Sequence, residues 1–233
     1  MRKIILALLV SGLPFAASAA DNIDKQLLAM AGNYEIGKPE QRIKKITYSI
    51  AEQNNQDNQI QINQQVEKFS NVSMFSSANS HVKNKTTSVK GRPNAKSLIL
   101  LNHWELRWKM DEGAFTTQNL HISPPPVQWS KQGGDFQSSA VLVDKNGRIF
   151  LKEQCRLGAQ QDAQQLHSRL KGAVQQAQCK MTLNNEAGTL NMSQDFEGYY
   201  LPGAQIFIPR TLVVTNNRTG RIDKVVYQID KIN

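Results

Sequence analysis

The sequence predicts an α+β fold made mainly of antiparallel β hairpins, with one amphipathic helix at about 159–172 packed on a sheet. Two observations lead to this prediction. Several segments alternate apolar and polar residues with the period of two that is typical of half-buried strands. The segment between the two cysteines instead spaces its apolar residues by three and four positions, which indicates a helix.

The first element, at residues 1–19, is expected to be a secretory signal peptide. A basic start at Arg2 and Lys3 precedes the apolar run Ile4–Val10, and the small residues Ala17–Ala19 suit cleavage by a signal peptidase. We therefore expect a periplasmic or secreted protein. Its mature part, residues 20–233, is expected to form a single mainly β domain without a transmembrane segment, because no later apolar run approaches about 20 residues.

The strongest predicted strand is Ser97–Lys109, in which Trp104, Leu106 and Trp108 alternate with charged residues. Another strand is expected at Lys44–Glu52. Two hairpins are predicted around turn sequences, one across Lys145-Asn146-Gly147 and one across Asn216–Gly220. In the second hairpin, Val225, Tyr227 and Ile229 share one face.

A polar, basic loop is predicted at about 77–96, because this stretch has no acidic residue and almost no large apolar one. The loop is either a solvated segment or an anion contact. Its candidate anion-binding residues are Lys83, Lys85, Lys90, Arg92 and Lys96.

Cys155 and Cys179 are expected to form a disulfide, because exported proteins meet an oxidising environment. A helix over the whole of Ala159–Ala177 would be about 28 Å long. The flanking residues can retrace only about 20 Å. Either the helix ends near Gly172 and the bond forms, or the two thiols stay apart.

No catalytic, cofactor or metal motif stands out, so we expect a protein that is not an enzyme and has no cofactor or metal. One register of the hairpin around Asp111–Gly113 would place His103 opposite His121, and a slip of one residue removes this pair. Trp104, Trp108 and Trp129 are either a ligand platform or core residues.

The formal net charge of +9 favours anionic partners, so we expect an envelope protein or an anionic envelope component as partner. The basic stretch lacks the aromatic residues with which proteins stack nucleic-acid bases, which argues against nucleic acid.

Three functions fit these features. The main prediction is a non-enzymatic exported protein that binds or helps assemble another cell-envelope component. One alternative is a lipid or lipoprotein carrier with an apolar groove under a curved sheet, favoured by the apolar residues on both faces of Leu98–Leu101. The other alternative is an envelope hydrolase with dispersed catalytic residues.

Overall fold

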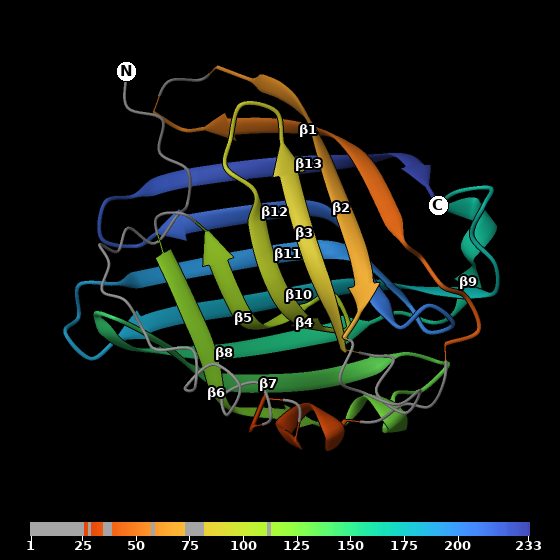
Figure 1. Cartoon of the computed structure of the whole chain (residues 1–233), viewed down its shortest axis with the longest axis horizontal. Helices are drawn as coiled ribbons and strands as arrows, with labels where there is room; N and C mark the ends of the chain where they lie inside the picture. Colours follow the sequence, from red (N-terminus) through yellow and green to blue (C-terminus); the bar gives the residue numbers. More distant parts are fainter. Residues whose placement is uncertain (1–25, 28, 35–38, 57–58, 73–81, 111–112) are drawn as a thin grey trace.

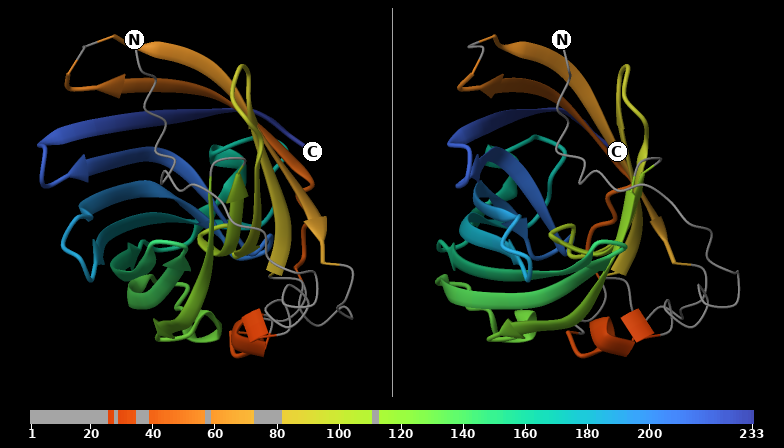
Figure 2. Two further views of the ribbon diagram at one scale, coloured as in Figure 1. Left: turned by 60° about the vertical axis from the view of Figure 1, so that its left-hand side comes forward. Right: turned by 90° about the vertical axis from the view of Figure 1, so that its left-hand side faces the viewer.

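The chain folds almost entirely into antiparallel strands that curl into a closed sheet (Figures 1 and 2). The computed structural model describes residues 26–27, 29–34, 39–56, 59–72, 82–110 and 113–233. The predicted signal peptide lies outside these residues. The α+β prediction with an inserted helix is wrong, because a closed antiparallel β-sheet takes its place.

The regular elements, in chain order, have the following bounds. The strands are β1 Lys45–Asn54, β2 Gln61–Asn71, β3 Val82–Val89, β4 Ala95–Leu100, β5 Trp104–Met110, β6 Gly113–Ser123, β7 Gly134–Asp144, β8 Gly147–Leu157, β9 Gln161–Asp162, β10 Ala173–Asn185, β11 Asn191–Leu201, β12 Ile206–Asn216 and β13 Arg221–Ile232. The short 3₁₀ turns are η2 Pro126–Gln128 and η3 Ala163–Gln165.

The sheet closes because its first and last strands pair with each other. Each strand from β1 to β8 pairs with the next in sequence, β8 pairs with β10, and the series continues through β11 and β12 to β13. Strand β13 then pairs with β1, so every described strand except β9 belongs to one ring. A ring leaves no open sheet edge, so its backbone groups are satisfied without a covering helix.

The segment predicted as a helix at 159–172 forms β9, η3 and turns. The side chain of Asp162 accepts a hydrogen bond from the Gln164 backbone, and Gly172, at φ +79°, precedes β10. Ala163 and Leu170 are fully buried in a cluster that Leu166 also contacts. The spacing by three and four residues therefore reflects a compact loop that packs these side chains on the sheet, and a loop can meet the same burial pattern as a helix.

The two turn-based hairpin predictions are confirmed by β7–β8 and β12–β13.

The prediction of a basic loop at about 77–96 is wrong for Val82–Val89, which forms β3, and for Ala95–Lys96, which begins β4. Residues 77–81 lie outside the described part of the chain. The small polar side chains of β3 suit a strand here because both neighbouring strands pair with it along most of its length.

The turn between β4 and β5 reaches across the ring and explains why Leu98–Leu101 is apolar on both faces. The Phe207 backbone N–H, on β12, donates to the carbonyl oxygen of Leu101 at 2.8 Å. Nδ2 of Asn102 donates to the Phe207 carbonyl at 2.9 Å. Because β4 and β12 are not neighbours in the sheet, these bonds cross its inner space, and Leu98–Leu101 are all buried.

A short helix at residues 26–32, residue 28 excepted, lies near β6 and β7 (Figure 1). After it, the hydroxyl of Tyr34 donates to the carbonyl oxygen of Leu120 at 2.9 Å and accepts from the Ile122 backbone at 3.2 Å. Among the described residues, no helix has the length and apolar character needed to cross a membrane.

Replacing Leu100 by alanine tests the packing of the β4–β5 turn. We expect Leu100→Ala to lower the free energy of unfolding by about 2–5 kcal/mol, because Leu100 is fully buried and its truncation removes buried apolar contacts. Urea denaturation measures this loss. Val226→Ala, at a side chain that is 40% exposed on β13, should cost less than about 1 kcal/mol, and equal losses for both variants would contradict the buried turn.

Candidate functional site

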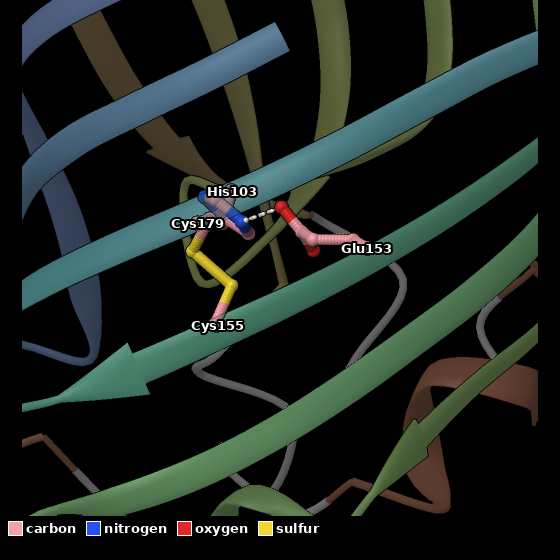
Figure 3. A group of neighbouring side chains, drawn as sticks. All are labelled: His103, Glu153, Cys155 and Cys179. Carbon is pink, nitrogen blue, oxygen red and sulfur yellow. Dashed lines mark hydrogen bonds and ion pairs between the residues drawn. A yellow bond between two sulfur atoms is a disulfide. The ribbon is translucent and has the colours of Figure 1, made fainter. Parts of the chain in front are cut away.

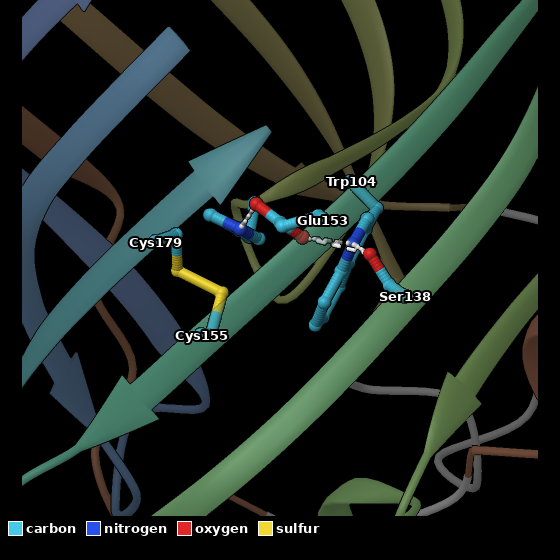
Figure 4. The surroundings of a disulfide bond; sticks show 6 residues. Trp104, Ser138, Glu153, Cys155 and Cys179 are labelled. Carbon is cyan, nitrogen blue, oxygen red and sulfur yellow. Dashed lines mark hydrogen bonds and ion pairs between the residues drawn. A yellow bond between two sulfur atoms is a disulfide. The ribbon is translucent and has the colours of Figure 1, made fainter. Parts of the chain in front are cut away.

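A buried polar centre lies beside the disulfide, where the β4–β5 turn meets β8 (Figures 3 and 4). Nε2 of His103 donates to Oε1 of Glu153 at 2.8 Å. Oε2 of the same carboxylate accepts from the Ser138 hydroxyl at 2.7 Å and from the Trp104 indole at 3.1 Å. Both carboxylate oxygens of Glu153 thus accept hydrogen bonds, and those from His103 and Trp104 hold the β4–β5 turn against the wall of the ring.

The partners of Glu153 decide its charge. Burial alone would raise the pKa of this carboxyl, but the His103 imidazole and the hydrogen bonds from Ser138 and Trp104 outweigh burial and hold the pKa below its usual value. Glu153 is therefore ionised at neutral pH. It lies on β8 with the same orientation as Leu151 and Cys155, which face the core. This centre is not predicted from the sequence. The signal that could have indicated it is Glu153 itself, a charged residue at a position that shares a strand face with the inward-facing Leu151 and Cys155.

The predicted disulfide between Cys155 and Cys179 is confirmed, although not with the expected short helix. The two residues are direct cross-strand partners on β8 and β10, so sheet register brings them together without any helix. His103 and Glu153 lie close enough to the two sulfurs to resemble a metal-ligand group. The sulfurs are bonded to each other, however, so only one nitrogen and one carboxylate remain for an ion.

The register that would place His103 opposite His121, which the sequence left open, does not occur. Strands β5 and β6 pair one residue away from the expected register, with Trp108 opposite Phe115. His103 lies in the turn before β5, and His121 pairs with Ser139 on β7. A register shift of one residue is enough to separate the two side chains, because neighbouring residues of a strand face opposite sides of the sheet.

The three tryptophans of the candidate ligand platform do not form one cluster in the structure. Trp104 is buried, and Trp129 stacks on Phe136 with ring centroids 4.4 Å apart, so these two belong to an aromatic core. Trp108 lies apart from them and stacks on Phe115 at 5.7 Å, where both rings are only half-buried.

The structure also separates the five candidate anion-binding residues. Lys85 is buried between Glu67 and Glu105, at 3.6 and 3.8 Å, and Arg92 forms an ion pair with Glu52. Burial alone would lower the pKa of Lys85, but the two carboxylates outweigh it and raise the pKa. These cations are therefore already neutralised within the protein.

The other three candidates differ from this pair. Lys90 and Lys96 are exposed, whereas Lys83 is buried. Burial, with a smaller contribution from Arg42, lowers the pKa of Lys83 to about 8. The five residues thus form no common anion site.

A second feature, the inner apolar wall, lies on β10–β13. We define this wall by Met181, Leu183, Met192, Leu212, Val225 and Tyr227. Cross-strand partners share a face of a sheet. Buried Cys179 and Phe196 pair with each other, Phe196 pairs with Leu212, and Leu212 pairs with Val225. The wall therefore faces the same side as the disulfide and the core.

Exposure of this inner face changes along the strands. On β10, Ala177 and Cys179 are buried, whereas Met181 and Leu183, on the same face, are only half-buried. The other members of the wall are half-buried as well. The wall bridges the two buried cores, since Met181, Leu183 and Leu212 pack against one and Val225 and Tyr227 against the other. The wall can contact an apolar ligand, and Gln194 and Asp223, which share its face through the row Met181–Gln194–Val214–Asp223, border it toward the turns that end β10 and β12.

No family model matches this chain, and no curated protein matches it. A domain from Vibrio parahaemolyticus named as an outer membrane lipoprotein-sorting protein is similar in structure, with 11% identity, a TM-score of 0.45 and coverage of 91% of this chain and 93% of that one.

Two further solved structures are also similar. A LolA superfamily protein from Nitrosomonas europaea has 8% identity and a TM-score of 0.35, covering 90% of this chain and 92% of its own. An exported protein with a YmcC-like fold from Bacteroides fragilis has 9% identity and a TM-score of 0.34, covering 85% of this chain and 99% of its own. These similarities are too distant to assign a family or an activity.

Replacing Glu153 by glutamine tests the polar centre through its pH dependence. Because the folded pKa is lowered, the carboxylate stabilises the fold above its unfolded pKa of about 4.3, and this contribution is lost as the pH falls through the lower folded pKa. We expect urea denaturation of Glu153→Gln to show a smaller stability loss on acidification than the parent protein. Glu197→Gln, on the exposed side of β11, should keep the parent profile, and an unchanged profile in Glu153→Gln would contradict this account.

Replacing Lys83 by methionine tests the buried amine. With a folded pKa of about 8 and an unfolded pKa of about 10.4, the charged lysine destabilises the fold below pH 8. We expect Lys83→Met to raise the free energy of unfolding at pH 7 by up to about 3 kcal/mol. This gain should disappear as the pH rises above 10.5, and a gain that stays constant with pH would show that charge burial is not its cause.

Proposed function

We propose that the protein is an exported, non-enzymatic carrier that binds an apolar ligand, such as the acyl chain of a lipid, on the inner face of the closed sheet. The observation that carries this proposal is the inner apolar wall, whose members are half-buried although they face the same side as the fully buried core. Because of this surface, we favour the carrier alternative over the broader prediction of an envelope-binding protein.

The energetics favour an acyl chain on this surface. Burying a methylene group contributes about 0.8 kcal/mol, so a chain that buries about ten of them gains on the order of 8 kcal/mol. Before the entropy cost of ordering the ligand, this corresponds to a dissociation constant of about 1 μM. A partly apolar inner face is also typical of ligand sites in curved antiparallel sheets.

The half-buried pair of Trp108 and Phe115 supports the same location. Strand β6 begins beside the end of β7, since Thr116 pairs with Val143, and β7 turns into β8 there. The beginning of β8 in turn pairs with the end of β10, through Leu151 and Leu183. The aromatic pair and the inner apolar wall therefore lie toward the same end of the ring. A ligand held there would contact both.

The side on which the ligand binds is tested with neighbouring residues of β13. Val225 belongs to the inner apolar wall, and Val226 faces the other side of the sheet. We expect Val225→Glu to weaken binding of a dansyl-labelled fatty acid at least about tenfold, because the new carboxylate would lie opposite Glu52 and place a second negative charge against the apolar chain. Val226→Glu should leave binding unchanged.

The measurement is the increase of dansyl fluorescence on titration, with urea denaturation to verify that both variants fold. If the parent protein does not bind the probe, or if both variants bind it equally, the carrier proposal is wrong.

A further inference from the structure

Four lysines lie in one straight row across five neighbouring strands. The lysine row comprises Lys45, Lys68, Thr86, Lys96 and Lys109, each the direct cross-strand partner of the next. Strands lie about 4.8 Å apart, so the row spans about 19 Å. It is a continuous band of positive charge that crosses β1–β5.

The lysine row lies on the outside of the ring. Lys68, Lys96 and Lys109 are exposed, whereas Glu67 and Ser97, which precede or follow two of them in sequence, are buried on the opposite face. Lys68 and Lys96 also flank Thr86, so neither has a carboxylate as its neighbour in the row. Among the described residues, this outer face therefore presents three exposed lysines along the row.

Like charges in direct opposition destabilise a sheet. Lys45 opposes Lys68, and Lys96 opposes Lys109, so the row contains two such pairs. The other wall of the ring differs, because Lys180 on β10 pairs with Asp195 on β11. A polyanionic surface would remove the repulsion within the row and gain an attraction to each lysine.

Exposed apolar side chains accompany the lysine row on the same side of the sheet. Ile62, Ala51 and Val226 are cross-strand partners on β2, β1 and β13, and Ile62 and Val226 are 78% and 40% exposed. Ala51 lies six residues from Lys45 on β1, which corresponds to about 20 Å. Both residues face outward, because they are six positions apart and alternate residues of a strand share a face.

We propose that this outer face, formed by β13 and β1–β5, docks on a bilayer that contains anionic phospholipid. The lysine row would contact lipid phosphates, while Ile62 and Val226 would enter the interface between headgroups and acyl chains. The combination favours a bilayer over nucleic acid, which would require stacking aromatics beside the cations. The proposal does not depend on the carrier function.

Vesicle co-sedimentation tests the docking face, with the exported chain that begins near Asp21. Vesicles of phosphatidylcholine with phosphatidylglycerol are compared with vesicles of phosphatidylcholine alone. Each lysine near an anionic surface favours binding by a factor of about five. We therefore expect the double variant Lys45→Gln and Lys68→Gln to bind the anionic vesicles about 30-fold more weakly. Raised salt should weaken the parent protein in the same direction.

Matched controls come from the opposite wall. Lys152→Gln with Lys180→Gln makes the same change in net charge on exposed positions of β8 and β10, and should bind as the parent does. Ile62→Ser should also weaken binding, whereas Phe150→Ser, at a side chain that is 39% exposed on β8, should not.

Three results would overturn the docking proposal. The first is equal binding to neutral and anionic vesicles. The second is an equal loss for the two lysine double variants, which would show that net charge alone governs binding. The third is retention of the protein by soluble polyanions as strongly as by vesicles, with no effect of Ile62→Ser.

Discussion

Closure of the antiparallel sheet by the pairing of β13 with β1 is the constraint on which the rest of the molecule depends. Once the ring is closed, no sheet edge needs a covering helix, but the space that it encloses must be filled by side chains or by a ligand. The β4–β5 turn fills one part of this space and is tied to Phe207 on the far wall. Along β10 the inner face becomes less completely covered from Cys179 to Leu183, and the inner apolar wall includes this part of the strand.

The polar groups inside the ring follow from the same constraint. A carboxylate that faces the core is tolerated only with full hydrogen bonding or a counter-ion. Glu153 has His103, Ser138 and Trp104 as partners, and Glu67 has Lys85. The first of these centres fixes the β4–β5 turn beside the disulfide, and the second joins β2 to β3. Both centres stabilise the positions of strands around the proposed ligand surface, and neither is needed to contact the ligand.

Local signals in the sequence predicted several strands and hairpins, but neither the turn that divides the predicted strand Ser97–Lys109 into β4 and β5 nor the closure of the sheet. Alternation in Val225, Tyr227 and Ile229, and the Asn-Gly turn before β8, depend on neighbouring residues and could be recognised. The segment around Leu166 could not, because a loop folded over a sheet buries residues at the spacing of a helix. The prediction of a loop at Val82–Val89 is wrong because this stretch pairs with both β2 and β4, and because Glu67 and Glu105 neutralise Lys85 within the sheet. The inner apolar wall required the cross-strand registers, which no single segment encodes.

The proposed carrier function requires that an acyl chain lies against the inner apolar wall. Photolabelling with a fatty acid that carries a diazirine near its end, followed by peptide mapping, tests this location most directly. We expect saturable labelling on Met181, Leu212 or Val225, which unlabelled fatty acid suppresses. Labelling confined to outward-facing residues such as Ile62 and Val226, or labelling that excess fatty acid does not suppress, would contradict it.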